Sequence, residues 1–173
     1  ACLWLSHLGM RYHSDEMALV DRDTLSLTAL TRPYTLKRPL VGAVRRKIVD
    51  PLRAMLDSGV DRAADLLESS ANLWLAHRAV NPDYQHQVPP LKAIVFPVYS
   101  NDGQPGLTQI PAARAAPELM RGQFYGQRFE DHGFAVISKL LRNCQVYIAV
   151  YPGLEQLAHF IQPLLQGEES EAD

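Results

Sequence analysis

Apolar and polar residues alternate along several short stretches of the chain, which is the pattern of half-buried strands. The clearest strand is predicted over residues 93–99, where Ile94, Val95 and Phe96 make a short apolar run that fits full burial. Further strands are predicted over residues 11–14, 17–20, 25–30, 34–37, 107–110 and 145–150.

Other stretches carry apolar residues at helical spacing. Residues 1–8 have the character of a helix end, and Gly9 suits its C-terminal cap. A helical run over residues 40–56 is expected to split at Pro51, because proline removes a backbone donor and clashes with the preceding turn. Further helices are predicted over residues 60–74, 112–120, 128–141 and 154–165.

The order of these elements favours an α/β fold with a mixed sheet, because strands and helices alternate loosely. Turns are predicted at residues 21–23 and 101–103, and a polar loop over residues 81–90. Residues 1–166 are expected to form a single domain, and the acidic tail 167–173 is expected to be disordered.

Composition narrows the classes of partner. The formal net charge of the 173 residues is −2, which argues against nucleic acid and anionic membranes as partners. The basic cluster Arg45-Arg46-Lys47 is interpreted as an exposed helix face. Cys2 and Cys144 lack metal-ligand spacing and are interpreted as reduced, which predicts a cytoplasmic location.

Candidate chemistry lies in the segment that contains Ser14, Asp15 and Glu16. An acid at a strand end can hold Mg²⁺ against nucleotide phosphates, or accept the proton of an attacking hydroxyl. Successive strand residues point to opposite faces, so the two acids are not expected to share one role. Two alternatives stay open: the acid pair can be a solvated turn, and His13 can be structural or can tune Asp15.

Residues 8–21 resemble the segment after the phosphate-loop helix in bacterial kinases related to HPr serine kinase, where the pattern is roughly Gly-x-x-x-x-Ser-Asp-Glu-x-x-x-Leu/Val-Asp. Further matches follow in order at residues 32–37, at residues 94–99 and in a helical C-terminal part that ends near Leu165. The resemblance therefore runs over most of the chain.

The resemblance implies a P-loop kinase fold, shared with phosphoenolpyruvate carboxykinase: a mixed sheet with flanking helices. It also implies ATP and Mg²⁺ as cofactors, and transfer to a serine hydroxyl of a protein or peptide. Asp15 matches the acid with base or metal duty, Glu16 matches its neighbour, and Ser14 and Lys37 match positions that contact phosphate or substrate. HPr kinases are hexameric, so a homo-oligomer stays open.

The chain departs from the family pattern in three places. It lacks the Gly-x-x-x-x-Gly-Lys-Ser/Thr loop, so that loop and its preceding strand are expected upstream and this chain alone is expected to be inactive. Val98 replaces a frequent Arg, and residues 69–80 match poorly, which leaves the acceptor unidentified. The alternative is a non-catalytic pseudokinase or a peptide-binding or protein-binding module.

Overall fold

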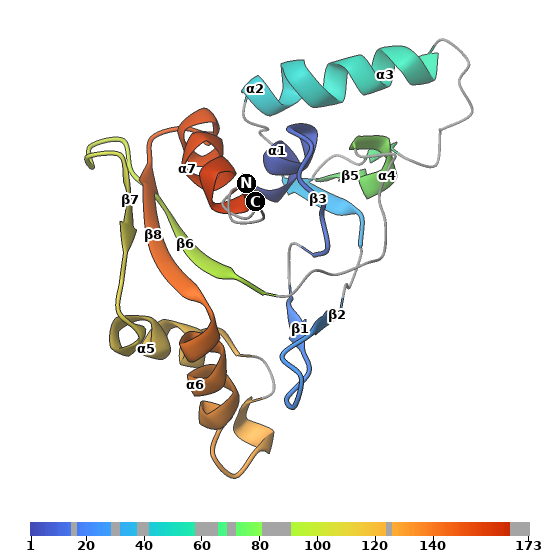
Figure 1. Ribbon diagram of the computed structural model, residues 1–173. Coiled ribbons are helices and arrows are strands. Elements are labelled where there is room, and N and C mark those ends of the chain that lie inside the picture. The colour runs from blue at the N-terminus through green and yellow to red at the C-terminus, as the bar shows by residue number, and fades with distance from the viewer. Residues whose placement is uncertain are drawn as a thin grey trace, which may run out of the picture. The chain divides into compact units, whose positions relative to one another are not determined.

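A computed structural model of the chain is mixed α/β and contains small sheets, one of them mixed (Figure 1). Contacts divide the chain into two compact units. Unit 1 comprises Ala1–Leu19 and Thr28–Val88, and unit 2 comprises Val20–Leu27 and Pro89–Asp173. The prediction of a single domain over residues 1–166 stays a prediction. The structure describes residues 1–14, 17–28, 32–37, 42–57, 66–68, 72–80, 91–123 and 126–166.

Unit 1 begins with helix α1 (Cys2–His7), which confirms the predicted N-terminal helix. Its end is a glycine cap, since Gly9 has a φ of +91° and its N–H donates to the Ser6 carbonyl at 3.0 Å. Leu3, Trp4 and Ser6 are buried, so α1 presents one face to the interior of the unit.

The second helical run of unit 1 is continuous, so the predicted split at Pro51 is wrong. Helix α2 (Gly42–Val44) passes into a π-helical segment, η1 (Arg45–Val49), and then into α3 (Asp50–Asp57), as Figure 1 shows. The Asp50 N–H donates to the Arg45 carbonyl, five residues back, directly before the proline. Pro51 has no N–H to donate, so a regular helical hydrogen bond is missing at this position. The wider π turn shifts the backbone hydrogen bonds to partners five residues back, and the helix continues.

Three antiparallel strands form a small sheet in unit 1: β3 (Tyr34–Lys37), β4 (Leu66–Glu68) and β5 (Asn72–Leu75), in the order β3-β5-β4. The helix predicted over residues 60–74 is therefore wrong at the described positions. Leu73 and Leu75 are buried while Asn72 and Trp74 are half-buried, which is the period of a strand. Pairing with β3 outweighs the helical spacing. The short helix α4 (His77–Val80) follows.

The segment that leads to the acid pair is not a strand, so the strand predicted over residues 11–14 is wrong. A short hairpin follows, with β1 (Leu19–Val20) paired to β2 (Leu27–Thr28). Its predicted turn is confirmed, because Asp21 Oδ1 accepts bonds from the N–H groups of Asp23 at 3.0 Å and Thr24 at 2.7 Å. The strand predicted over residues 25–30 begins only at Leu27, because Leu25 has a φ of +59°. Residues 29 and 30 lie outside the described chain, so the predicted end of this strand stays a prediction.

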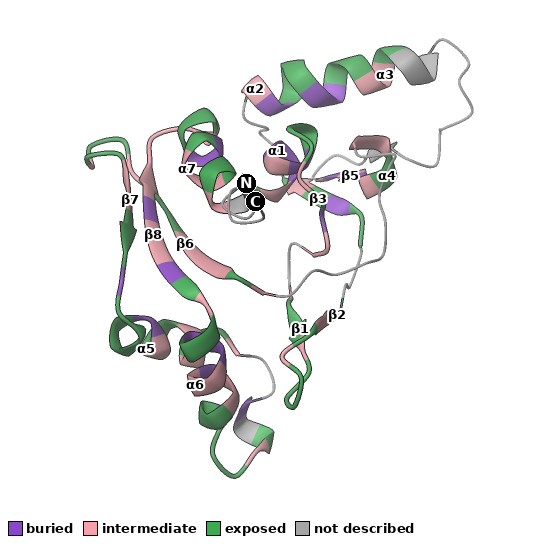
Figure 2. Ribbon diagram, in the orientation of Figure 1, coloured by how far each residue is buried: buried purple, intermediate pink, exposed green. Residues whose placement is uncertain are grey.

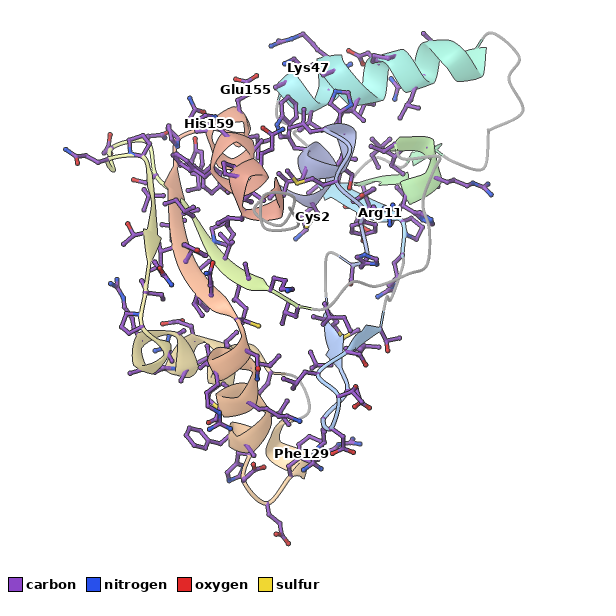
Figure 3. The ribbon with its side chains drawn as sticks, in the orientation of Figure 1. Cys2, Arg11, Lys47, Phe129, Glu155 and His159 are labelled. Atoms are coloured by element: carbon purple, nitrogen blue, oxygen red, sulfur yellow. The ribbon has the colours of Figure 1, made fainter. Side chains whose placement is uncertain are left out.

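The hairpin tip belongs to unit 2 through two long-range contacts. The Arg22 guanidinium carbon lies 4.5 Å from the centre of the Phe129 ring, and Phe129 is labelled in Figure 3. The Lys139 ammonium donates to the Asp23 carbonyl. Both contacts join residues 20–27 to the C-terminal part of the chain.

Unit 2 is built on a mixed sheet of β6 (Ala93–Tyr99), β7 (Gly106–Gln109) and β8 (Gln145–Tyr151), in the order β6-β8-β7. Strand β8 runs parallel to β6 and antiparallel to β7. All three strands were predicted, but full burial of β6 is wrong: residues 93–96 are half-buried and residues 97–99 are exposed (Figure 2). An edge position accommodates Pro97, which has no N–H to donate.

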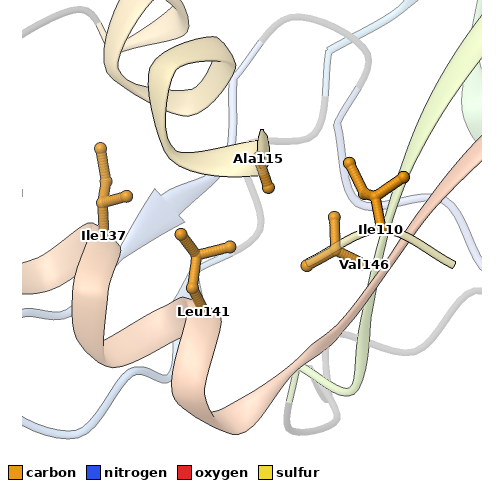
Figure 4. Packing of buried hydrophobic residues seen from close by; sticks show 5 residues of the cluster. All are labelled: Ile110, Ala115, Ile137, Leu141 and Val146. Carbon is orange, nitrogen blue, oxygen red and sulfur yellow. The ribbon is translucent and has the colours of Figure 1, made fainter. Parts of the chain in front are cut away.

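Three helices complete unit 2: α5 (Ala112–Gly122), α6 (Phe134–Asn143) and α7 (Leu154–Gln166). A short 3-10 turn, η3 (Gly126–Arg128), precedes α6. Helix α6 begins later than the predicted residue 128, because the Asp131 carboxylate accepts the N–H groups of Gly133 at 3.0 Å and Ala135 at 2.8 Å. Helices α5 and α6 pack on the sheet through a shared apolar cluster (Figure 4), which consists of Ile110, Ala115, Ile137, Leu141 and Val146.

None of the helices in the described ranges is long and apolar enough to cross a membrane. The predicted loop at residues 81–90 and the predicted tail at residues 167–173 lie outside the described residues.

Candidate functional site

The structure describes two of the four predicted site residues. Asp15 and Glu16, the predicted catalytic acids, lie outside the described residues. Ser14 and Lys37 are described, and both belong to unit 1. The geometry of the site is therefore that of the residues around the acid pair.

Ser14 makes a hydrogen bond to the nearby backbone. Its Oγ accepts a hydrogen bond from the Met17 N–H at 3.1 Å, so the two bonded residues flank positions 15 and 16. A serine hydroxyl that accepts from the backbone three residues on stabilises a turn in place of regular secondary structure. The bond gives the Ser14 oxygen a structural role. Its predicted contact with phosphate stays a prediction.

A buried aromatic cluster supports the segment that carries Ser14. The rings of Tyr12 and Tyr34 lie with their centroids 4.3 Å apart. Tyr34 is 2% exposed, and its hydroxyl lies 2.6 Å from Ser6 Oγ in a buried hydrogen bond. The Tyr12 hydroxyl donates to the Arg32 carbonyl at 3.4 Å. This tyrosine cluster (Ser6, Tyr12 and Tyr34) joins α1, the segment before Ser14 and the start of β3.

Lys37 lies at the other end of β3 from the tyrosine cluster. Lys37 is three steps along the strand from Tyr34, which is about 10 Å of chain. The odd spacing directs the two side chains to opposite faces, and Lys37 is exposed while Tyr34 is buried. Within the described chain, no hydrogen bond or ion pair joins Lys37 to Ser14. The structure therefore ties Ser14 to the start of β3 and does not bring Lys37 to it.

His13 brings little positive charge to the neighbouring acid pair at neutral pH. Burial lowers the pKa of the half-buried imidazole, and repulsion by the Arg11 guanidinium lowers it further. A pKa below the ordinary value of about 6.5 leaves the neutral form predominant at pH 7. An electrostatic effect of His13 on Asp15 would therefore appear only in acid.

Among the described residues, no group of three or more His, Cys, Asp or Glu side chains lies close enough together to hold a metal ion. Asp15, the predicted ligand of Mg²⁺, lies outside the described residues, so its metal role stays a prediction.

Comparison of the chain with protein-family models, with curated proteins and with solved structures found no match. The resemblance to kinases related to HPr serine kinase therefore rests on the sequence pattern.

The basic cluster at Arg45-Arg46-Lys47 has partners within the chain. The three side chains are exposed, as predicted. Arg45 Nε lies 3.5 Å from Asp50 Oδ1, and the Lys47 ammonium lies 5.1 Å from the centre of the Trp4 ring (Lys47 is labelled in Figure 3). The Arg45–Asp50 pair is exposed and contributes little to stability, while Lys47 lies over the ring of Trp4, a buried residue of α1.

Sequence reasoning missed the tyrosine cluster. Tyr12 and Tyr34 stand inside two of the motifs that carry the resemblance, but Ser6 and Tyr34 are 28 residues apart. No spacing rule connects side chains at that separation, so the contact had no signal in the sequence. The one available hint was the presence of a tyrosine in each motif.

Proposed function

We propose that this chain belongs to an ATP- and Mg²⁺-dependent phosphotransferase that phosphorylates a serine hydroxyl of a protein or peptide. The ordered series of motifs at residues 8–21, 32–37 and 94–99 supports the proposal. The structural observation that carries it is the hydrogen bond from the Met17 N–H to Ser14 Oγ, which joins the residues on either side of the acid pair in the sequence. A carboxylate that must meet a phosphate needs a fixed backbone on both sides.

The proposed roles follow from charge and proton affinity. Asp15 accepts the proton of the attacking serine or binds the metal, and Glu16 supports it. Lys37 compensates phosphate charge, which requires that the end of β3 approach the nucleotide. Ser14 accepts the Met17 N–H and offers its hydroxyl to phosphate. ATP supplies the phosphoryl group when bound.

The proposal also includes a phosphate-binding loop supplied by sequence outside these 173 residues, since they contain no Gly-x-x-x-x-Gly-Lys-Ser/Thr motif. The corresponding fold is that of P-loop kinases and phosphoenolpyruvate carboxykinase, and the mixed sheet β6-β8-β7 is compatible with it. We propose a cytoplasmic setting. The free thiols of Cys2 and Cys144 are consistent with it, because disulfides are rare in the cytoplasm.

The test uses a protein that contains these residues with their natural flanking sequence. Transfer of labelled phosphate from ATP to serine peptides is compared for the wild type, for Asp15→Asn and for Asp102→Asn, a matched loss of charge at an exposed turn of unit 2. Asp15→Asn is expected to lower kcat by about 10²–10⁴-fold, because an amide can neither take up the proton nor hold the metal as a carboxylate does. Wild-type rates in Asp15→Asn would remove Asp15 from the mechanism.

The 173-residue chain alone offers a second test. Calorimetry with ATP and Mg²⁺ is expected to detect no binding, because the amides and the lysine that hold the phosphates lie in the loop. Micromolar affinity of the isolated chain for ATP would contradict an external phosphate loop.

A non-catalytic peptide-binding module is the second candidate, and the exposed end of β6 favours it. Val98 is 44% exposed and Tyr99 is 61% exposed on a strand at the edge of its sheet. Edge strands of this kind can bind an extended peptide as an additional strand. Peptide binding that Val98→Asp abolishes, in a protein without phosphoryl transfer, would favour this candidate.

A further inference from the structure

Among the strands that the structure describes, β6 forms one edge of the mixed sheet, because the order is β6-β8-β7 (Figure 1). Hydrogen bonds at the two ends of β6 define which of its backbone groups face β8. At the start, the Gln145 N–H donates to the Lys92 carbonyl at 3.0 Å. At the end, the Ser100 N–H donates to the Tyr151 carbonyl, also at 3.0 Å. Even-numbered residues of β6 therefore direct their backbone polar groups toward β8.

The odd-numbered residues direct theirs to the free edge. The parallel pairing of β6 with β8 is continuous over residues 93–99, so the backbone alternates along the whole strand without a bulge. The N–H groups of Ala93, Val95 and Tyr99 consequently point away from β8. Residue 97 has the same orientation, but it is a proline and has no N–H. Pro97 thus leaves a gap in the row of donors along this edge.

The composition of β6 makes such a gap important. All seven residues of the strand are apolar or aromatic, and none is charged. Uncharged segments of six or seven residues with high strand propensity tend to pair edge to edge when they contain no proline. Residues 97–99 are exposed, and Tyr99 is 61% exposed. The other edge strand, β7, has only four residues, and a short edge limits pairing by itself.

We propose that Pro97 protects the free edge of β6 from pairing with the same strand of a second copy of this chain. A strand that lies along this edge would place a carbonyl group opposite Pro97, and that carbonyl would lose water without gaining a donor. The protection does not depend on phosphoryl transfer. It also leaves the outward N–H of Tyr99 in place at the exposed end of β6.

The experiment restores the missing donor. Pro97→Val and Pro97→Thr both supply an N–H, the first with an apolar and the second with a polar side chain. Pro117→Val is the matched control, because Pro117 is an exposed proline inside helix α5 and the restored N–H has its acceptor within that helix. In sedimentation velocity at equal concentration, the mean mass of both Pro97 variants is expected to rise about twofold or more over that of the wild type. Pro117→Val is expected to keep the wild-type mass.

Amide hydrogen exchange then locates the contact. In the wild type, the N–H groups of Phe96 and Val98 are expected to exchange at least about tenfold more slowly than those of Val95 and Tyr99, because the former face β8. In the associated Pro97 variants, the N–H groups of Val95 and Tyr99 are expected to become protected as well.

Three results would overturn the proposal. The first is a wild-type mass in either folded Pro97 variant, as judged by circular dichroism. The second is association that leaves Val95 and Tyr99 unprotected, because another surface would then be responsible. The third is equal protection of Val95, Phe96 and Tyr99 in the wild type, because the edge would then be paired already. This last comparison needs no variant, so it tests the proposal even if neither substitution folds.

Discussion

The Ser6–Tyr34 hydrogen bond has a stability effect that a double-mutant cycle measures. Tyr34→Phe keeps the ring against Tyr12 but leaves the Ser6 hydroxyl, which is 3% exposed, without its partner. An unsatisfied buried hydroxyl costs about 1–3 kcal/mol, and we expect unit 1 to lose that much free energy of unfolding. Ser6→Ala is expected to cost a similar amount, because the Tyr34 hydroxyl then loses its bond to Ser6.

The double variant is expected to cost clearly less than the sum of the two single variants. Removing both hydroxyls leaves neither member of this bond without the other, so the coupling energy is expected to be about 1 kcal/mol or more. Additive costs, or single costs below about 0.5 kcal/mol, would refute the claim that this bond is made and buried.

Urea unfolding followed by tryptophan fluorescence is the suitable assay, because the two tryptophans of the chain, Trp4 and Trp74, both lie in unit 1. The signal therefore reports the unit that contains the mutation. With a denaturant slope of about 1–3 kcal/mol per molar urea, the expected loss shifts the midpoint by on the order of 1 M.

Two further predictions concern unit 2. Gly126→Ala would place a Cβ 2.0 Å from the Gln123 side chain, whose Nε2 donates to the His132 carbonyl at 2.6 Å. We therefore expect the variant to lose about 1–3 kcal/mol of free energy of unfolding. This loss is expected to disappear largely in a Gln123→Ala background. Equal costs of Gly126→Ala in the two backgrounds, measured by circular dichroism during urea unfolding, would contradict this. Hydrogen bonds from the N–H groups of Ala135 and Gly133 lower the pKa of Asp131. The ionised carboxylate therefore stabilises the fold above its unfolded pKa of about 3.9. This stabilisation is lost as the pH falls through the lower pKa of the folded state. The difference in Tm between wild type and Asp131→Asn is therefore expected to be larger at pH 7 than at pH 2, and a difference independent of pH would contradict it.

The sequence predicted those helices and strands that are determined by the pattern of neighbouring residues. Strand β8 and helix α7 lie close to their predicted positions, because each has one strong period with turn residues on its flanks. The helix predicted over residues 60–74 failed, since Leu67 and Leu73 fit more than one period and pairing across β3, β4 and β5 decides between them. The break expected at Pro51 failed because the rule for a regular α-helix does not anticipate a π turn.

For the candidate site, the sequence located the segment but not its support. The motif around Ser14 was evident from residue types alone, and the structure adds that Ser14 bonds to Met17. The tyrosine cluster depends on how α1 and β3 pack, which no local pattern encodes. Lys37 matched a motif position by sequence, yet strand geometry directs it to the face opposite Tyr34.

The proposed phosphotransferase requires that Ser14 and Met17 lie near a metal-bound nucleotide. Nuclear magnetic resonance with Mn²⁺ in place of Mg²⁺ tests it most directly, because the unpaired electrons of Mn²⁺ broaden the signals of nearby nuclei. In the protein with its flanking sequence, Mn²⁺ and ATP together are expected to broaden the amide signals of Ser14 and Met17 in the wild type, and less so in Asp15→Asn. Sharp signals at both residues while calorimetry shows the nucleotide bound would contradict the account.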